Sequence, residues 1–221
     1  MIDWTPLLLS FRVAAVATLL AFLAGVAIAA LLAVVRPRGS ELIDALVAAP
    51  MVLPPTVLGY YVLVALGRES ALGRAFEAAT GEPIVFTPTG AVVAASIGAL
   101  PLITKSARAA MEEVDPRLVG AARTLGAGPL RVFFTIILPL SRTGISAGVA
   151  LGFARALGDF GVTLMVAGNI PGVTRTAALA IYDLVQANRD QEALGMALVM
   201  TSLSVAVLYA VNRATRGPAR G

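Results

Sequence analysis

Residues 7–35 form an apolar run that is broken only by Arg12 and by the small polar residues Ser10 and Thr18. An α-helix rises about 1.5 Å per residue, and the hydrocarbon core of a bilayer is about 30 Å thick, so about 20 apolar residues cross it. The run is long enough to do so. It therefore predicts a membrane-spanning helix near the start of the chain.

A cleaved signal peptide is the alternative for this run, because Ala27-Ile28-Ala29 has the small residues of a cleavage site. The apolar region of a signal peptide is only about 7–15 residues long, and basic residues precede it. Here the basic residues Arg36 and Arg38 follow the run. This order favours a span that is retained.

Further apolar runs recur along the chain, which is 58% hydrophobic and only 14% charged over 221 residues, whereas a soluble domain is about 25% charged. We expect the remaining spans at these positions: 42–66, 89–110, 133–157 and 193–209. A polar loop with a short surface helix is expected between the second and third spans, a polar segment over residues 158–192, and a frayed basic tail from Asn212. The sequence predicts an all-α, polytopic transmembrane helical bundle of about five spans in a lipid bilayer, with residues 1–221 forming a single domain.

The chain contains neither cysteine nor histidine. Disulfides, His/Cys metal sites, cysteine nucleophiles and histidine proton chemistry are therefore excluded, and we expect no catalytic and no metal-binding residue. A membrane-embedded enzyme is a disfavoured alternative, because the carboxylates of Glu112, Glu113 and Asp115 come without a nucleophile and base. A structural membrane protein without cargo is a second alternative. No basic run is long enough to predict nucleic-acid binding.

The basic residues predict the orientation, because loops on the cytoplasmic side carry an excess of lysine and arginine. An external N-terminus places most of them inside: Arg36, Arg38, Lys105, Arg108, Arg117, Arg123, Arg131, Arg142, Arg213, Arg216 and Arg220. Fewer remain for the outer loops: Arg68, Arg74, Arg175 and Arg189. We therefore expect the N-terminus outside and the C-terminus in the cytoplasm.

Prolines interrupt two of the expected spans. Pro50, Pro54 and Pro55 remove backbone donors and restrict the residues before them, which predicts a kinked or broken second span. Discontinuous helices in transporters line the substrate route, whereas a packing kink without contact to cargo is the alternative. Pro101 is expected to interrupt the third span.

Residues 115–131 predict a compact helix-turn-helix on the cytoplasmic side. Asp115 caps a helix that begins at Pro116, Gly126 ends it in the left-handed conformation, and Gly128 opens the next helix. That second helix runs into the fourth span, where Pro139 is expected to bend it.

The first of these helices carries Ala121 and Ala122, which let it approach another surface closely, and Arg117 and Arg123, which are candidate contacts for an acidic rim. A plainer interpretation is also available. Alanine is the best helix former, and arginine is common in cytoplasmic loops.

The spacing favours the first interpretation. Ala121-Ala122, Gly126, Ile136 and Leu138-Pro139 resemble, at every interval, the "EAA-x3-G-x9-I-x-LP" motif of permease subunits of ABC importers, with Gly120 in place of the motif's glutamate. Longer stretches resemble the molybdate-type permeases, with sulfate permeases close by, among the binding-protein-dependent transport inner membrane components: residues 49–68, 86–102, 120–140, 153–176 and 180–186.

The resemblance implies an ABC importer permease (MetI-like) core with cytoplasmic coupling helices in the bacterial inner membrane. It also implies a homodimer, two ABC ATPase subunits on the cytoplasmic side and an extracytoplasmic oxyanion-binding protein. The chain has no G-x-x-x-x-G-K-[ST] loop, so we expect no cofactor in this chain and ATP with Mg²⁺ in the ATPase subunits. The cargo is expected to be molybdate, with tungstate or sulfate/thiosulfate as alternatives. The implied coupling residues are Arg117, Ala121, Ala122, Arg123, Gly126 and Pro139.

An oxyanion route needs N–H donors, hydroxyls or a modest positive potential. We expect candidates at three places: the helix start at Pro54, Pro55 and Thr56; the pair Arg155 and Asp159; and the turn with Asn169, Thr174 and Thr176. Either threonine of the turn is expected to cap a short helix whose positive end faces an anion, or else the turn is an ordinary capped loop. Arg155 and Asp159 are four residues apart on the fourth span, so they are expected to neutralise each other as a gate latch or as a structural pair.

Overall fold

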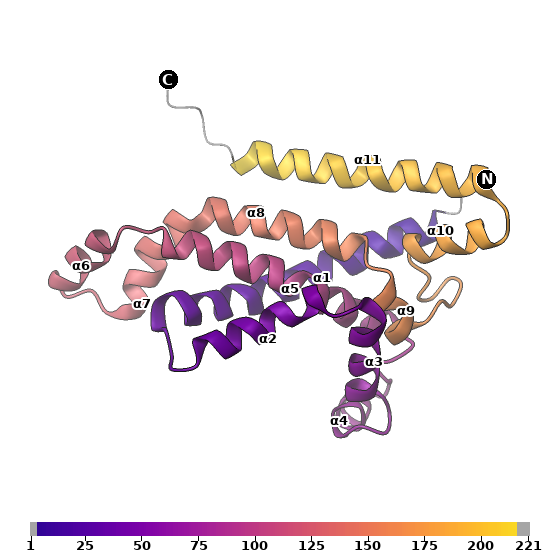
Figure 1. Cartoon of the computed structure of the whole chain (residues 1–221), viewed down its shortest axis with the longest axis horizontal. Helices are drawn as coiled ribbons and strands as arrows, with labels where there is room; N and C mark the ends of the chain where they lie inside the picture. The colour runs from indigo at the N-terminus through magenta and orange to yellow at the C-terminus, as the bar shows by residue number, and fades with distance from the viewer. Residues whose placement is uncertain (1–3, 216–221) are drawn as a thin grey trace.

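The computed structural model describes residues 4–215, and no strand occurs among them (Figure 1). Helices and two π-helical segments follow in this order: α1 Thr5–Ala30, η1 Leu31–Val35, α2 Ser40–Val52, α3 Pro55–Leu66, α4 Ala71–Thr80, α5 Pro88–Glu112, α6 Pro116–Thr124, α7 Pro129–Val132, η2 Phe133–Ile137, α8 Leu138–Leu157, α9 Gly161–Ala167, α10 Ala177–Gln186 and α11 Asp190–Thr215. The all-α prediction is confirmed.

Within the described residues, four helical segments are long and apolar enough to cross a membrane: Thr5–Val35, Pro88–Glu112, Pro129–Leu157 and Asp190–Val211. The bent pair of α2 and α3 makes a fifth span if its two halves are counted together. The prediction of about five spans is confirmed. The first and fourth spans each contain a π-helical segment, η1 and η2 respectively.

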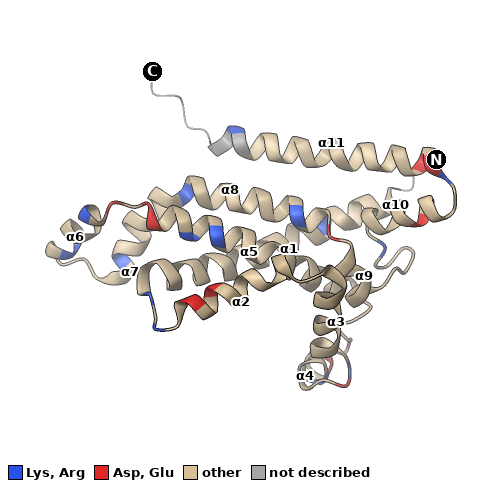
Figure 2. Ribbon diagram, viewed as in Figure 1, with Lys and Arg blue, Asp and Glu red and all other residues tan. Residues whose placement is uncertain are grey.

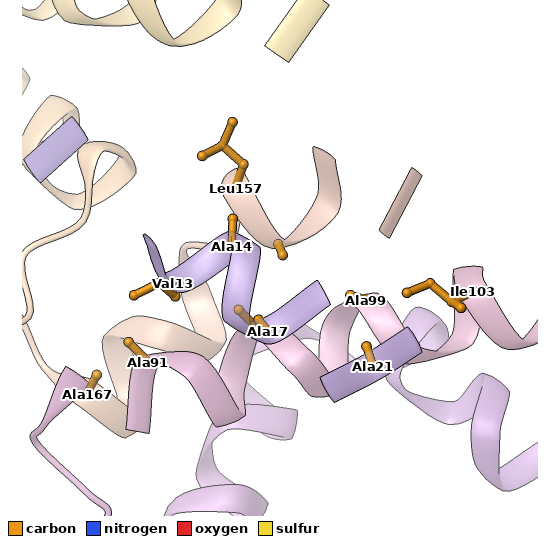
Figure 3. Packing of buried hydrophobic residues seen from close by; sticks show 11 residues of the cluster. Val13, Ala14, Ala17, Ala21, Ala91, Ala99, Ile103, Leu157 and Ala167 are labelled. Carbon is orange, nitrogen blue, oxygen red and sulfur yellow. The ribbon is translucent and has the colours of Figure 1, made fainter. Parts of the chain in front are cut away.

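Small residues form the centre of the bundle, where α1, α5 and α8 pack together (Figure 3). Helices pack closely in a membrane when small side chains let their backbones approach. The cluster at this centre consists of Val13, Ala14, Ala17, Ala21, Ala91, Ala95, Ala99, Ile103, Ala156, Leu157 and Ala167.

Glycines four residues apart on α8 allow the close contact with α5. A Cβ atom on Gly148 would lie 2.7 Å from Cβ of Ser106, and one on Gly152 would lie 2.7 Å from Cγ1 of Ile103. Real side chains do not approach so closely, so larger residues at these two positions would push the helices apart.

The second span is broken, as its prolines predict. The axes of α2 and α3 differ by 116°, and Leu53 and Pro54 between them are extended. Pro50, in contrast, is accommodated inside α2. Figure 1 shows α3 running steeply away from the long axis of the bundle, with α4 at its far end.

The two polar segments contain short helices. The surface helix expected between the second and third spans is α4, and the hydroxyl of Ser70 caps it by accepting the N–H of Gly73 at 2.8 Å. The segment 158–192 folds into α9 and α10 before α11 begins.

Two expectations about helix continuity are wrong. Pro101 lies inside α5, fully buried between neighbouring helices, and α5 is unbroken there. A proline removes one backbone donor, and packing with adjacent helices holds the helix together despite that loss. The tail does not fray at Asn212, because α11 continues to Thr215; residues 216–221 lie outside the described residues.

Positive charges gather at the end of the bundle that carries α6 and α7, whereas the opposite end carries α9, α10 and the start of α11 (Figure 2). An ion network at the first end ties the broken span to the bundle. Asp44 of α2 accepts hydrogen bonds from Lys105 and, at 3.0 Å, from Arg108, and Arg108 also binds Glu112 at 2.8 Å.

Candidate coupling and transport sites

The helix-turn-helix forms as its capping residues predict. Oδ1 of Asp115 accepts the N–H of Arg117 at 2.8 Å, and Pro116 occupies the first turn of α6. Gly126 has a φ of +84°, and the N–H of Ala127 closes the turn on the carbonyl of Ala122 at 3.0 Å. The elbow is therefore built from local hydrogen bonds and one left-handed glycine.

α6 lies on the surface at one end of the bundle, and none of its residues is fully buried. Val119 and Ala122 pack against a cluster formed by the ends of the first and third spans and by η2. Arg117, Ala121 and Arg123 are exposed. The helix thus keeps most of its surface open to a partner.

An apolar hollow of about 410 Å³ lies between α6 and the start of the fourth span. We call it the Leu125 hollow, and its lining residues are Leu118, Ala121, Ala122, Leu125, Thr135, Ile136, Pro139 and Leu140. Leu125 is 88% exposed beside it. Exposed apolar patches of this kind mark interaction sites.

The predicted coupling residues do not share one surface. Ala121, Ala122 and Pro139 line the Leu125 hollow, Arg123 lines a separate hollow, and Arg117 and Gly126 line neither. Sequence reasoning missed Leu118 and Leu125. These two leucines are seven residues apart, which places both on one face of a helix, and this spacing could have predicted an apolar contact face.

The half-helix start at Pro54, Pro55 and Thr56 is exposed in the described chain. It meets the start of α9, because a Cβ atom on Gly161 would lie 2.7 Å from Cβ of Pro55. Two helix starts, each the positive end of a helix dipole, therefore lie side by side at the break in the second span.

Arg155 and Asp159 form the expected pair, with Nη1 of Arg155 donating to Oδ1 of Asp159 at 2.8 Å. Asp159 lies beyond the last residue of α8 rather than on the span itself. Its second oxygen accepts the N–H of Thr163 at 3.0 Å and the hydroxyl of Thr163 at 2.6 Å. The buried carboxylate thus joins the end of α8 to α9, and its contacts account for both of its oxygens.

The expectation that Thr174 or Thr176 caps a short helix is wrong. The hydroxyl of Thr174 accepts the N–H of Ile170 at 3.0 Å and so closes the preceding turn. The hydroxyl of Thr176 makes no cap, and instead Ser10 of the first span accepts the N–H of Ala177 at 2.7 Å. The first N–H group of α10 is therefore satisfied by a side chain of α1, which is distant in the sequence, and this hydrogen bond holds the start of α10 against α1.

Asn169 belongs to a polar cluster that braces the turn. Its amide donates to both carboxylate oxygens of Asp183 at 2.8 and 3.0 Å, and its own oxygen accepts from Nε of Arg175 at 3.1 Å. Arg175 also pairs with Asp183 at 3.1 Å. Sequence reasoning missed Asp183. The pattern that could have indicated it is a single carboxylate in the mostly apolar α10.

Residues 14–216 match the family model described as "Binding-protein-dependent transport system inner membrane component". The chain belongs to this family. It is therefore a multi-pass inner membrane component of a transport system, and the prediction of a transport protein rather than an enzyme is confirmed.

Two curated relatives match over more than nine-tenths of their length. The "Molybdenum transport system permease protein ModB" of Escherichia coli K12 is 42% identical over 209 residues, which cover 92% of this chain and 91% of that protein. The protein with the same description from Azotobacter vinelandii is 39% identical over 214 residues, covering 97% of this chain and 95% of that protein.

Solved transporters share the fold. A chain from the inward-facing MetNI methionine ABC transporter has a TM-score of 0.74 at 18% identity and covers 96% of this chain and 93% of its own length. A chain from a bacterial ABC transporter that imports alginate has a TM-score of 0.76 at 13% identity, covering 98% and 79%. The predicted ABC importer permease architecture is confirmed.

Proposed function

We propose that this protein is the permease subunit of an ATP-driven ABC importer for molybdate. The observation that carries the proposal is the match, over more than nine-tenths of the chain, to molybdenum transport permeases. Tungstate has nearly the same size and charge, and sulfate is a smaller dianion of the same shape, so both are the competing cargoes.

The proposed assembly contains two copies of this chain, two ATPase subunits and an extracytoplasmic oxyanion-binding protein. The chain carries no phosphate-binding loop of the G-x-x-x-x-G-K-[ST] type, so ATP and Mg²⁺ belong to the ATPase subunits. The excess of basic residues at the α6–α7 end supports a cytoplasmic position for that end, with the N-terminus outside and the C-terminus inside. The whole chain acts as one transmembrane domain.

The coupling element in this proposal is the helix-turn-helix of residues 115–131. Its support is the exposed α6, the left-handed Gly126 and the Leu125 hollow beside them. An ATPase subunit that grips α6 would transmit its closure through α7 into the fourth span, because α7, η2 and α8 are continuous.

The proposed pathway runs past the break in the second span. Pro54, Pro55 and Thr56 lie there at a helix start, adjacent to the start of α9. Pro54 and Pro55 have no backbone N–H, so the N–H and the hydroxyl of Thr56 offer the weak, uncharged contacts to an oxyanion, which suits a route that must also release its cargo. Arg155 and Asp159 support the neighbouring turn, and Asn169 and Thr174 brace the loop before α10. Thr176 follows them at the start of α10, and its buried hydroxyl has no hydrogen-bond partner in the described chain.

Uptake by reconstituted vesicles tests the cargo. The chain, its ATPase subunit and its binding protein are placed in liposomes, and ATP-dependent uptake of molybdate is measured against uptake of sulfate. We expect molybdate uptake that sulfate in tenfold excess does not suppress. Uptake of sulfate alone, or hydrolysis without uptake of any oxyanion, would contradict the proposal.

A further inference from the structure

α6 presents two flanks of different chemistry. At 100° per residue, Pro116, Gly120 and Arg123 fall on one flank, and Leu118 and Leu125 fall on the opposite one. The second flank borders the apolar Leu125 hollow. The first borders another hollow, of about 290 Å³, between α6, the end of α5 and the end of the first span.

We call this second space the Arg123 hollow. Its lining residues are Ala33, Val34, Arg36, Met111, Glu112, Val114, Pro116, Val119, Gly120, Arg123 and Ile137. It therefore combines an apolar floor with two arginines and one carboxylate.

The charges of the Arg123 hollow are not balanced. Within the part of the chain that the structure describes, neither Arg36 nor Arg123 forms an ion pair, and Nε of Arg36 only donates to the carbonyl of Ala33 at 3.0 Å. Glu112, the one acidic lining residue, is bound to Arg108 at 2.8 Å. The hollow is left with two unpaired guanidinium groups.

Gly120 keeps this hollow open. A Cβ atom on Gly120 would meet no heavy atom within 4 Å, so the space beside it could hold a longer side chain. No residue from 4 to 215 places a side chain within 4 Å of that point. A carboxylate at this point would lie one helical turn before Arg123 and could pair with it.

We propose that the Arg123 hollow receives an acidic side chain of the ATPase subunit that docks on α6. The inference rests on the proposed function and adds the chemistry of the partner. Charge complementarity favours a carboxylate, because a guanidinium binds it with two parallel hydrogen bonds. α6 is also the element that projects beyond the ends of the spans (Figure 1), and a partner that grips it reaches both flanks. The apolar hollow on one flank and the basic hollow on the other then define which way round the partner sits.

Substitutions at Gly120 test this. Gly120→Glu supplies the carboxylate from within the chain, and Gly120→Gln adds a side chain of the same size without charge. The affinity of the purified ATPase subunit for the full-length chain in detergent is measured for both variants, with Gly120→Ala to report the effect of helix propensity alone. We expect Gly120→Glu to bind the ATPase subunit about fivefold more weakly than Gly120→Gln, and its affinity to depend less on salt.

A reciprocal experiment identifies the partner's residue. Acidic residues on the surface of the ATPase subunit are replaced one at a time by lysine, and one such replacement is expected to restore binding to Gly120→Glu while weakening binding to the unaltered chain. Arg123→Gln should weaken binding in the same direction as Gly120→Glu.

Three results would overturn the inference. Equal affinities for Gly120→Glu and Gly120→Gln would leave ATPase docking intact but remove its acidic contact. A change in binding to phosphatidylglycerol vesicles, without a change in ATPase affinity, would assign the hollow to lipid phosphate instead. Failure of the ATPase subunit to bind the unaltered chain would overturn the proposed function as well.

Discussion

At the scale of single residues, the buried carboxylate of Asp159 shows how one side chain joins two helices, α8 and α9. It is only 3% exposed, and it accepts hydrogen bonds from Arg155 and from both donors of Thr163. Removing such a carboxylate leaves a buried hydroxyl and N–H unpaired, which is more costly than losing the attraction itself. This arrangement favours a structural pair over a gate latch.

A double-mutant cycle checks that conclusion. We expect Asp159→Ala to lower the free energy of unfolding by about 2–3 kcal/mol, because buried donors lose their acceptor. Arg155→Ala should cost less, because its side chain is 35% exposed. Thermal unfolding in detergent of both single variants and the double variant gives the coupling energy, for which we expect about 1 kcal/mol. Additive effects of the two substitutions would show that the ion pair contributes nothing to the stability of the fold.

The elbow between α6 and α7 is the clearest case at the scale of elements. Gly126 has a positive φ, which a residue with a Cβ adopts only with strain, whereas Gly128 has a φ of −68° and open space around it. The two glycines therefore offer a matched pair two residues apart.

Gly126→Val is expected to uncouple ATP hydrolysis from transport, because a β-branched residue cannot hold the left-handed turn that sets the angle of α6. Gly128→Ala should keep both activities. The measurement is the number of oxyanions imported per ATP hydrolysed in reconstituted vesicles. If Gly126→Val transports with the ratio of the unaltered protein, the elbow is not the coupling element.

The contact between α5 and α8 yields another prediction for a pair of elements. Gly152→Val should lower the melting temperature markedly, because its side chain would meet Ile103 at well below van der Waals distance. We expect the free energy of unfolding to fall by about 1–3 kcal/mol. Gly120→Ala is the control, since open space surrounds that position and alanine favours a helix by up to about 1 kcal/mol over glycine. A Gly152→Val protein as stable as that control would contradict the packing of these helices.

At the scale of the whole molecule, orientation in the membrane decides whether α6 faces the ATPase subunits. The chain contains no cysteine, so single introduced cysteines can be labelled without background. Leu125 near α6 and Ala79 near the end of α4 are two such positions, and both are surface-exposed.

We expect Leu125→Cys to react with a membrane-impermeant maleimide only after the membrane is permeabilised. Ala79→Cys should react without permeabilisation once the reagent reaches the external face of the inner membrane. Labelling of both cysteines without permeabilisation would show that the assumed orientation is wrong. The reverse pattern would place α6 outside and rule out docking of a cytoplasmic ATPase.

The sequence by itself determined the features that depend on neighbouring residues. Pro54 and Pro55 break the second span, Asp115 and Pro116 start α6, and Gly126 ends it, because backbone restriction and capping act within a few residues.

Only the tertiary structure decided the features that depend on distant partners. Pro101 stays inside an unbroken helix because neighbouring helices pack around it, and Ser10 rather than Thr176 satisfies the start of α10. The Arg123 hollow likewise needs the end of the first span to lie beside α6. Hydrogen bonds and charges are satisfied by whichever groups lie nearest in space, and spacing along the chain does not specify those groups.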